Sequence, residues 1–301
     1  MSEAMDPDEA DIEASRAPLM DHLIELRTRL IWSVVAFFVA FMICFYFSGQ
    51  IYLFLTEPFK VAGDLIAAEK AAGGAHGPFD LFMALIGLKD VPSAKGPDQL
   101  NLIFTAPLEL FFAKLKLAGF GALVLAFPVI AYQLYRFVAP GLYRRERNAF
   151  LPFLIAAPFL FLLGASLVYY VMMPFVMWFS LSQEIATEGV RVTLLPKVSE
   201  YLSLVTTLLL AFGLCFQLPV VVSLLGLSGL VKAHMLKAGR RFAIVGIAVV
   251  AAIVTPPDPI SMLMLCVPLW LLYEVSIWCV RLMEFRRRKA DDEAGTELAT
   301  V

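Results

Sequence analysis

Charged residues are scarce in this sequence of 301 residues. Asp, Glu, Lys and Arg together make up 17% of it, whereas about 25% is usual for a soluble domain. Hydrophobic residues reach 60%, and the mean hydropathy is +0.79. This composition excludes an ordinary soluble protein. It predicts an all-α integral membrane protein, because a helix satisfies its own backbone hydrogen bonds in lipid.

Residues that bind metals or carry out catalysis are also few. There are three histidines, none of them inside an expected membrane span, and the four cysteines lie in apolar stretches without CxxC spacing. A metal site and a disulfide framework are therefore not expected. The sequence has no HExxH, GxSxG or GxxxxGK[ST] motif, and no GxGxxG after a strand. We expect neither enzymatic activity nor a cofactor, and nucleic acid is not an expected partner.

The start of the chain lacks basic residues. Its first thirteen residues contain six acids and no Lys or Arg, unlike the basic start of a signal peptide. The first apolar segment should therefore remain as a membrane anchor. We expect residues 1–18 to form an acidic cytoplasmic tail, 19–285 a membrane domain, and 286–301 a polar cytoplasmic tail that is disordered from Ala290 onward.

Long apolar runs predict six transmembrane helices, since a span needs about 20 mostly apolar residues. Prolines inside several runs predict bends. The fifth run is short, so with the sixth it should form a short final hairpin around VTPPDP at 254–259, which would thin the bilayer locally. The six predicted spans are Leu30–Phe47, Leu115–Val138, Phe150–Phe179, Tyr201–Leu225, Phe242–Val254 and Ile260–Val280.

The Lys and Arg residues predict the orientation of these spans. Sixteen of the 24 lie in four segments, 16–29, 136–147, 232–241 and 281–289, which the six spans place on one side of the membrane. Because cytoplasmic loops are rich in these residues, this side and both termini are expected to be cytoplasmic. The long loop at about 56–108 is then external, and its Gly and Pro residues predict a flexible segment over 60–100.

Two motifs on the cytoplasmic side each carry one glutamate. HLIELRTRL at 22–30 has leucines at helical spacing and predicts an amphipathic helix at the membrane interface that leads into the first span. Its Glu25 either pairs with Arg29 one turn later or binds a ligand. The second motif, FVAPGLYRRER at 137–147, breaks at Pro-Gly and surrounds Glu146 with arginines. Glu146 either tempers the repulsion between them or binds a ligand.

Polar residues within or at the edges of the spans form a third group of functional candidates. Gln217, in FGLCFQLPV at 212–220, is the deepest of them. Its amide either satisfies the backbone near Pro219 or recognises a polar group. The other members of the group are Glu109, Lys114, Lys116 and Glu274.

Taken in order, these motifs resemble the TatC family, the polytopic core of twin-arginine protein translocases. The similarity runs from about Leu19 to Arg281. It rests on HLIELRTRL at 22–30, AFPVIAYQLYRFVAPGLYRRER at 126–147, FGLCFQLPV at 212–220 and VTPPDP at 254–259. The resemblance implies a receptor and core subunit in the bacterial inner membrane. Such a subunit binds twin-arginine signal peptides and exports folded proteins, driven by the proton-motive force.

The resemblance also implies roles for individual residues. The family's acidic contacts for the two signal-peptide arginines correspond to Glu25 and Glu146, and carboxylates suit the geometry of guanidinium groups. Arg27, Phe137 and Tyr143 match neighbouring family positions and are expected to shape the site.

The implied partners are the single-span proteins TatA and TatB, twin-arginine signal peptides, the lipid bilayer and further copies of the chain in a receptor complex. Partner helices are expected to contact Gln217, Thr255 and Met262. Many family members have glutamate where this chain has Gln217, so a titrating carboxylate is not available at that depth. A neutral amide still hydrogen-bonds to a polar group on a partner helix.

Two other classes of protein remain open at this stage. One is a secondary transporter of a small solute, with Glu109, Lys114 and Gln217 lining its path. The other is a non-catalytic membrane scaffold without cargo. A small solute should stabilise the transporter, whereas a signal receptor should crosslink to a twin-arginine peptide near its two glutamates.

Overall fold

The computed structural model describes residues 7–72, 83, 102–138, 144–183, 185–187, 190–192, 195–227, 229, 231–255 and 259–299. These residues form helices, apart from one two-stranded hairpin. In chain order the elements are α1 (Pro7–Tyr46), α2 (Ser48–Ala72), α4 (Glu109–Val138), α5 (Arg144–Leu167), the π-helix η2 (Val168–Met172), α6 (Met173–Ser182), β1 (Ile185–Thr187), β2 (Val190–Val192), α7 (Val198–Cys215), α8 (Leu218–Leu227), α9 (Ala233–Ala238), α10 (Arg240–Val254) and α11 (Pro259–Ala299).

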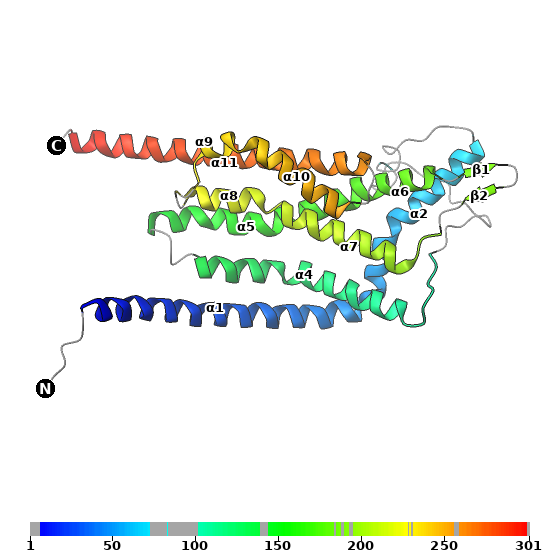
Figure 1. Cartoon of the computed structure of the whole chain (residues 1–301), viewed down its shortest axis with the longest axis horizontal. Coiled ribbons are helices and arrows are strands. Elements are labelled where there is room, and N and C mark those ends of the chain that lie inside the picture. Colours follow the sequence, from blue (N-terminus) through cyan, green and yellow to red (C-terminus); the bar gives the residue numbers. More distant parts are fainter. Residues whose placement is uncertain are drawn as a thin grey trace.

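The long helices lie side by side along one direction (Figure 1). α1 forms one edge with α4 beside it, α5 and α7 follow, and α10 and α11 form the opposite edge. We call the end where α1 begins, α5 begins and α11 ends the terminal end. At the other end, which we call the distal end, α4 and α7 begin and α2 crosses the bundle obliquely.

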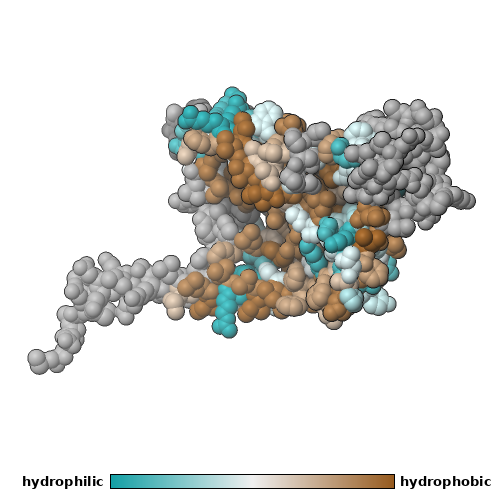
Figure 2. Space-filling model, turned by 45° about the vertical axis from the view of Figure 1, so that its right-hand side comes forward, coloured by the Kyte–Doolittle hydropathy of each residue, from teal (hydrophilic) through white to brown (hydrophobic). Residues whose placement is uncertain are grey.

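Within the residues that the structure describes, five helical stretches are long and apolar enough to cross a membrane. They coincide with five of the six predicted spans and make this a multi-pass helical membrane protein. Apolar side chains also cover most of the visible described surface (Figure 2), as expected for helices that face lipid. The five stretches are Leu23–Tyr46, Glu109–Phe137, Phe153–Ser182, Val198–Leu227 and Ser261–Phe285.

The remaining predicted span corresponds to α10, a helix of 15 residues. At about 1.5 Å per residue it is roughly 22 Å long, shorter than the hydrocarbon core of about 30 Å. α10 ends at Val254 and α11 begins at Pro259, so the predicted turn between them has the expected bounds.

One sequence prediction about the ends of the chain needs correction, and the structure adds a helix at the other end. The tail is not disordered from Ala290 onward, because α11 continues as one helix to Ala299. Its Arg, Lys, Glu and Ala residues favour a helix even without packing. Most of the acidic tail is helical too, since α1 begins at Pro7 and runs without a break into the first span. Proline is well tolerated at the first position of a helix.

One further correction concerns the segments at the distal end. The first part of the predicted flexible loop is helical, because α2 extends to Ala72 and buries Leu55, Phe59 and Ala62 on one face. Only the part from residue 73 onward, where most Gly and Pro residues lie, falls outside the described residues. The predicted all-α architecture is confirmed, with β1 and β2 added as one short antiparallel hairpin.

Small residues let α1 and α4 pack closely. Ala40 of α1 is buried against Ala122 and Ala126 of α4. A Cβ atom added to Gly121 would lie 3.0 Å from the sulfur of Cys44, so a larger residue here would require the Cys44 side chain to shift. The close contact fixes α1, with its HLIELRTRL motif, along the side of α4.

Two tyrosines fasten α2 to the main core. Pro58 lies inside α2 and has no N–H, so the carbonyl of Phe54, four residues earlier, loses its helical partner. The Tyr169 hydroxyl donates to this carbonyl at 2.8 Å. The Tyr201 hydroxyl donates to the next carbonyl, that of Leu55, at 2.7 Å. Both tyrosines are buried, so η2 and α7 together hold α2 at the distal end.

We predict that Tyr169→Phe destabilises the protein by about 1 to 3 kcal/mol, the usual penalty for a buried polar group without a partner. The ring that stacks on Phe54 is retained, so only the hydroxyl is lost. Tyr170→Phe is the matched control, because Tyr170 is the neighbouring residue and only partly buried. The stability of both variants is measured by unfolding in detergent. Equal stability of the two variants would contradict the role of the Tyr169 hydroxyl.

Candidate functional site

Glu25 lies on α1 near the terminal end and is paired within its own helix. Arg29 Nη2 donates to Glu25 Oε1 at 3.0 Å, and the Glu25 side chain is 31% exposed. The pairing of these residues predicted from their i,i+4 spacing is therefore confirmed. It uses one carboxylate oxygen, whereas a carboxylate has about four acceptor sites. Glu25 therefore keeps the capacity to accept hydrogen bonds from a second cation.

Two buried polar atoms near this pair have no hydrogen-bond partner within the described part of the chain. They are Nε of Arg29 on α1 and Oε1 of Gln133 on α4. α1 and α4 run antiparallel, with Cys44 beside Gly121, so Gln133 lies toward the level of the HLIELRTRL motif. A donor and an acceptor without partners mark this stretch of the interface as able to accept a polar ligand.

The other predicted receptor residues differ in how far the structure describes them. Arg27 is exposed on α1, and Phe137 is half-buried in the last turn of α4. Glu146 belongs to the first turn of α5, which lies at the terminal end together with the first half of α1 (Figure 1). The Glu146 side chain and the whole of Tyr143 fall outside the described residues.

Gln217 lies in the turn between α7 and α8, where α7 approaches α5 closely. Its Nε2 donates to the carbonyl of Ala157 on α5 at 2.9 Å. A Cβ atom added to Gly164 of α5 would lie 2.9 Å from the carbonyl oxygen of Phe212 on α7. The Gln217 amide therefore fastens two tightly packed helices together. The structure does not bring it next to Glu25.

Thr255 and Met262 lie on either side of the turn between α10 and α11. The Thr255 hydroxyl donates to the carbonyl of Ala251 at 2.8 Å, and the residue is 8% exposed. Met262 is partly buried against the main core. Both residues thus make contacts within the chain.

The sequence indicated Glu109 and Lys116 as span-edge residues but did not reveal their partners. Glu109 accepts hydrogen bonds from the Ser199 hydroxyl at 2.6 Å and from the Thr105 amide at 2.7 Å. Lys116 donates to the Ser203 hydroxyl at 2.7 Å. The two serines, four residues apart at the start of α7, were the available signal, since this spacing places them on one helix face.

The structure does not bring Glu109 and Gln217, two residues of the transporter alternative, into one site. Glu109 is bonded at the start of α7, whereas Gln217 follows the end of that helix. The 18 residues of α7 separate them by about 27 Å at 1.5 Å per residue.

The fold and the acidic residue at the terminal end thus define a class: a multi-pass helical membrane protein that presents Glu25 within a basic surface segment. Comparison with known proteins gives the family. A model described as "Sec-independent protein translocase protein (TatC)" matches residues 21–268. The chain belongs to the TatC family, as its motifs indicated.

Two relatives and one solved structure match along nearly their whole length. The Sec-independent protein translocase protein TatC of Magnetococcus marinus is 40% identical over 95% of this chain and 91% of its own. TatC of Escherichia coli K12 is 31% identical over 91% of this chain and 92% of its own. A solved crystal structure of the twin-arginine translocase receptor TatC superimposes with a TM-score of 0.67 at 31% identity, over 87% of this chain and 98% of that one.

We predict that Gln217→Leu lowers stability by about 1 kcal/mol through loss of the hydrogen bond to Ala157. Gln217→Glu should lose at least as much, because an ionised carboxylate has no donor for that carbonyl. Gln50→Leu is a matched control, since Gln50 is exposed. Thermal unfolding in detergent is the measurement. Unchanged stability in both Gln217 variants would contradict the role given to the amide.

Proposed function

We propose that this protein is the receptor and core subunit of a twin-arginine translocase. It binds the signal peptides of folded proteins and takes part in their export across the bacterial inner membrane. Membership of the TatC family over nearly the whole chain carries the proposal. The role is one of transport rather than catalysis, as the names of the relatives indicate.

The distribution of charge supports an orientation with both termini in the cytoplasm. The four basic segments belong to the first half of α1, the junction of α4 and α5, the α9–α10 region and the latter half of α11. All four lie at the terminal end (Figure 1). Positive residues collect on the cytoplasmic side of membrane proteins, so we assign the terminal end to the cytoplasm and α10 to a sixth, short span.

The proposed receptor site consists of Glu25 and Glu146, with Arg27, Phe137 and Tyr143 shaping its surroundings. Two neighbouring arginines of a signal peptide need carboxylates that accept paired hydrogen bonds from planar guanidinium groups. A lysine provides a point charge without this geometry. Because Arg29 already occupies one oxygen of Glu25, an arriving arginine shares this carboxylate or displaces Arg29 from it.

We predict that Glu25→Ala and Glu146→Ala each strongly reduce crosslinking between a twin-arginine peptide and the terminal end of the purified protein. Loss of a charge-assisted contact should weaken binding about tenfold or more. Glu57→Ala is the matched control, because Glu57 is an exposed glutamate on α2 at the distal end. A peptide with Lys in place of both arginines should bind the unaltered protein weakly.

The site assignment fails if arginine-dependent crosslinking persists in both glutamate variants. It also fails if Glu57→Ala reduces crosslinking as much as they do. Family membership is independent of this result, so the experiment tests the two residues rather than the family.

The proposed partners are the single-span subunits TatA and TatB, together with further copies of this chain in a receptor complex. We propose that their helices dock near Gln217, Thr255 and Met262, and that the proton-motive force drives export. Gln217 and Thr255 already bond within the chain. A polar group of a partner helix would therefore use their remaining acceptor capacity.

The short α10 suggests where the membrane is perturbed. A hydrophobic segment shorter than the bilayer thins it locally, so we propose that translocation takes place beside α10 and the start of α11. Lengthening both segments by one helical turn is then expected to impair export while signal-peptide crosslinking stays normal. Export in cells and crosslinking in membranes measure the two effects, and normal export would refute the thinning proposal.

A further inference from the structure

The contact between α1 and α4 continues into the pair of Glu25 and Arg29. On α1, residues that are buried or partly buried recur every three or four positions, so they form one stripe along the helix. α1 packs mainly against α4, and this stripe therefore faces α4. It includes Glu25, Arg29, Ser33, Phe37, Ala40 and Cys44. The facing stripe of α4 includes Ala122, Ala126, Ile130, Gln133 and Phe137.

The register of the two helices sets Arg29 level with Gln133. The helices run antiparallel, and Ala40 is buried against Ala122 and Ala126. Arg29 precedes Ala40 by eleven residues, so its level on α4 lies eleven residues after those two alanines, at 133–137. Gln133 is therefore within about one helical turn of Arg29 along the contact, roughly 6 Å or less.

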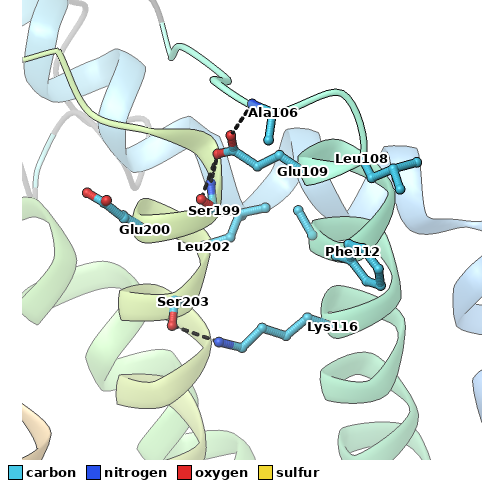
Figure 3. Close-up of a pocket in the computed structure, with 10 residues that line it drawn as sticks. Ala106, Leu108, Glu109, Phe112, Lys116, Ser199, Glu200, Leu202 and Ser203 are labelled. Atoms are coloured by element: carbon cyan, nitrogen blue, oxygen red, sulfur yellow. Dashed lines mark hydrogen bonds between the residues drawn. The ribbon is translucent and has the colours of Figure 1, made fainter.

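Each of these two residues keeps one buried atom without a hydrogen-bond partner among the described residues. Nε of Arg29 is a donor and Oε1 of Gln133 is an acceptor. The polar cluster at the distal end differs (Figure 3), because Glu109 there accepts hydrogen bonds at both oxygens, from Ser199 and from Ala106. A buried polar atom without a partner costs free energy. Bringing the Arg29 donor to the Gln133 acceptor would remove this cost for both atoms.

A weak bond keeps Arg29 on its own helix. Its Nη2 donates to Oε1 of Glu25 at 3.0 Å, and the two side chains are 19% and 31% exposed. An i,i+4 ion pair in contact with water adds little to stability, so it breaks easily. Arg29 thus occupies, through the same guanidinium chemistry, the carboxylate that we assign to a signal-peptide arginine. In the unbound protein it takes the place of the ligand.

We propose that Gln133 is a positioning residue that makes the receptor site selective for arginine by accepting Arg29 when it leaves Glu25. When a signal-peptide arginine reaches Glu25, Arg29 turns towards α4 and donates to Oε1 of Gln133. Both oxygens of Glu25 then accept the paired N–H groups of the peptide guanidinium. A lysine acts as a point charge, so it uses one oxygen and leaves Arg29 in place. This inference rests on the proposed receptor function and adds Arg29 and Gln133 to it.

The test measures the Kd of a fluorescent twin-arginine peptide for the purified full-length chain in detergent, by anisotropy. The same peptide with two lysines is measured beside it. Gln133→Met keeps the length of the side chain but replaces the amide oxygen by a weak acceptor. It should weaken binding of the twin-arginine peptide about three- to tenfold, as for one hydrogen bond lost. Binding of the lysine peptide should not change, and the exposed Gln50, as Gln50→Met, is the matched control.

A second variant tests the exchange from the other side. Arg29→Gln should tighten binding of the twin-arginine peptide, because no internal arginine then competes for Glu25. In this background Gln133→Met should have no further effect, since Arg29 is no longer there to be accepted. Arg241→Gln is the matched control for the loss of one positive charge. Arg241 is an exposed arginine of α10 at the terminal end, and its replacement should leave the Kd unchanged.

The proposal is overturned if Gln133→Met weakens both peptides equally or neither of them. It is also overturned if Arg29→Gln weakens binding of the twin-arginine peptide, or if Gln133→Met has the same effect with and without Arg29. Unfolding in detergent shows whether each variant is folded. If the unaltered protein does not distinguish the two peptides, the receptor function fails and the inference fails with it. An arginine preference that survives Gln133→Met refutes the inference alone.

Discussion

A backbone polar group that is shielded from water needs a partner inside the protein, whether lipid or packed side chains surround it. Pro58 violates this requirement by removing one N–H from α2, and the Tyr169 hydroxyl restores it from a distant helix. The hydroxyls of Thr206, Thr255 and Ser276 follow the same rule by bonding to carbonyls of their own helices. The tyrosine bonds differ because they join separate parts of the chain, and they hold α2 across the bundle.

Polar side chains fasten helices to one another at both ends of the bundle, but Glu25 is not used in this way. At the distal end, polar side chains fasten helices to one another, as Ser199 does for Glu109. On the α9–α11 edge, Arg240 is joined to Glu274 at 2.6 Å, and the Tyr273 hydroxyl donates to the carbonyl of Leu236. Among the described residues, Glu25 pairs only with Arg29 of its own helix. Within that part of the chain, no bond to another helix has to break when a ligand arrives.

The features that could be predicted from the sequence depend on neighbouring residues in the chain. Apolar length predicted five of the helices, and i,i+4 spacing predicted the pair of Glu25 and Arg29. Ser199, which donates to Glu109, is 90 residues away from it in the chain. Tyr169, which donates to the carbonyl of Phe54, is 115 residues away from Phe54. No local sequence pattern could reveal either hydrogen bond. The extent of α11 was missed for another reason: low hydropathy was taken to mean disorder, although charged residues and alanine also form helices.

The unbroken course of α11 has a mechanical consequence. Its 41 residues extend about 60 Å at 1.5 Å per residue, roughly twice the thickness of the hydrocarbon core. Its last third, residues 286–299, lies beyond the membrane-span candidate Ser261–Phe285 and continues it as one helix. A helix is stiff over this length, so a small tilt of the embedded part swings Ala299 through a wider arc. α11 thereby converts a change of angle within the bilayer into a displacement outside it.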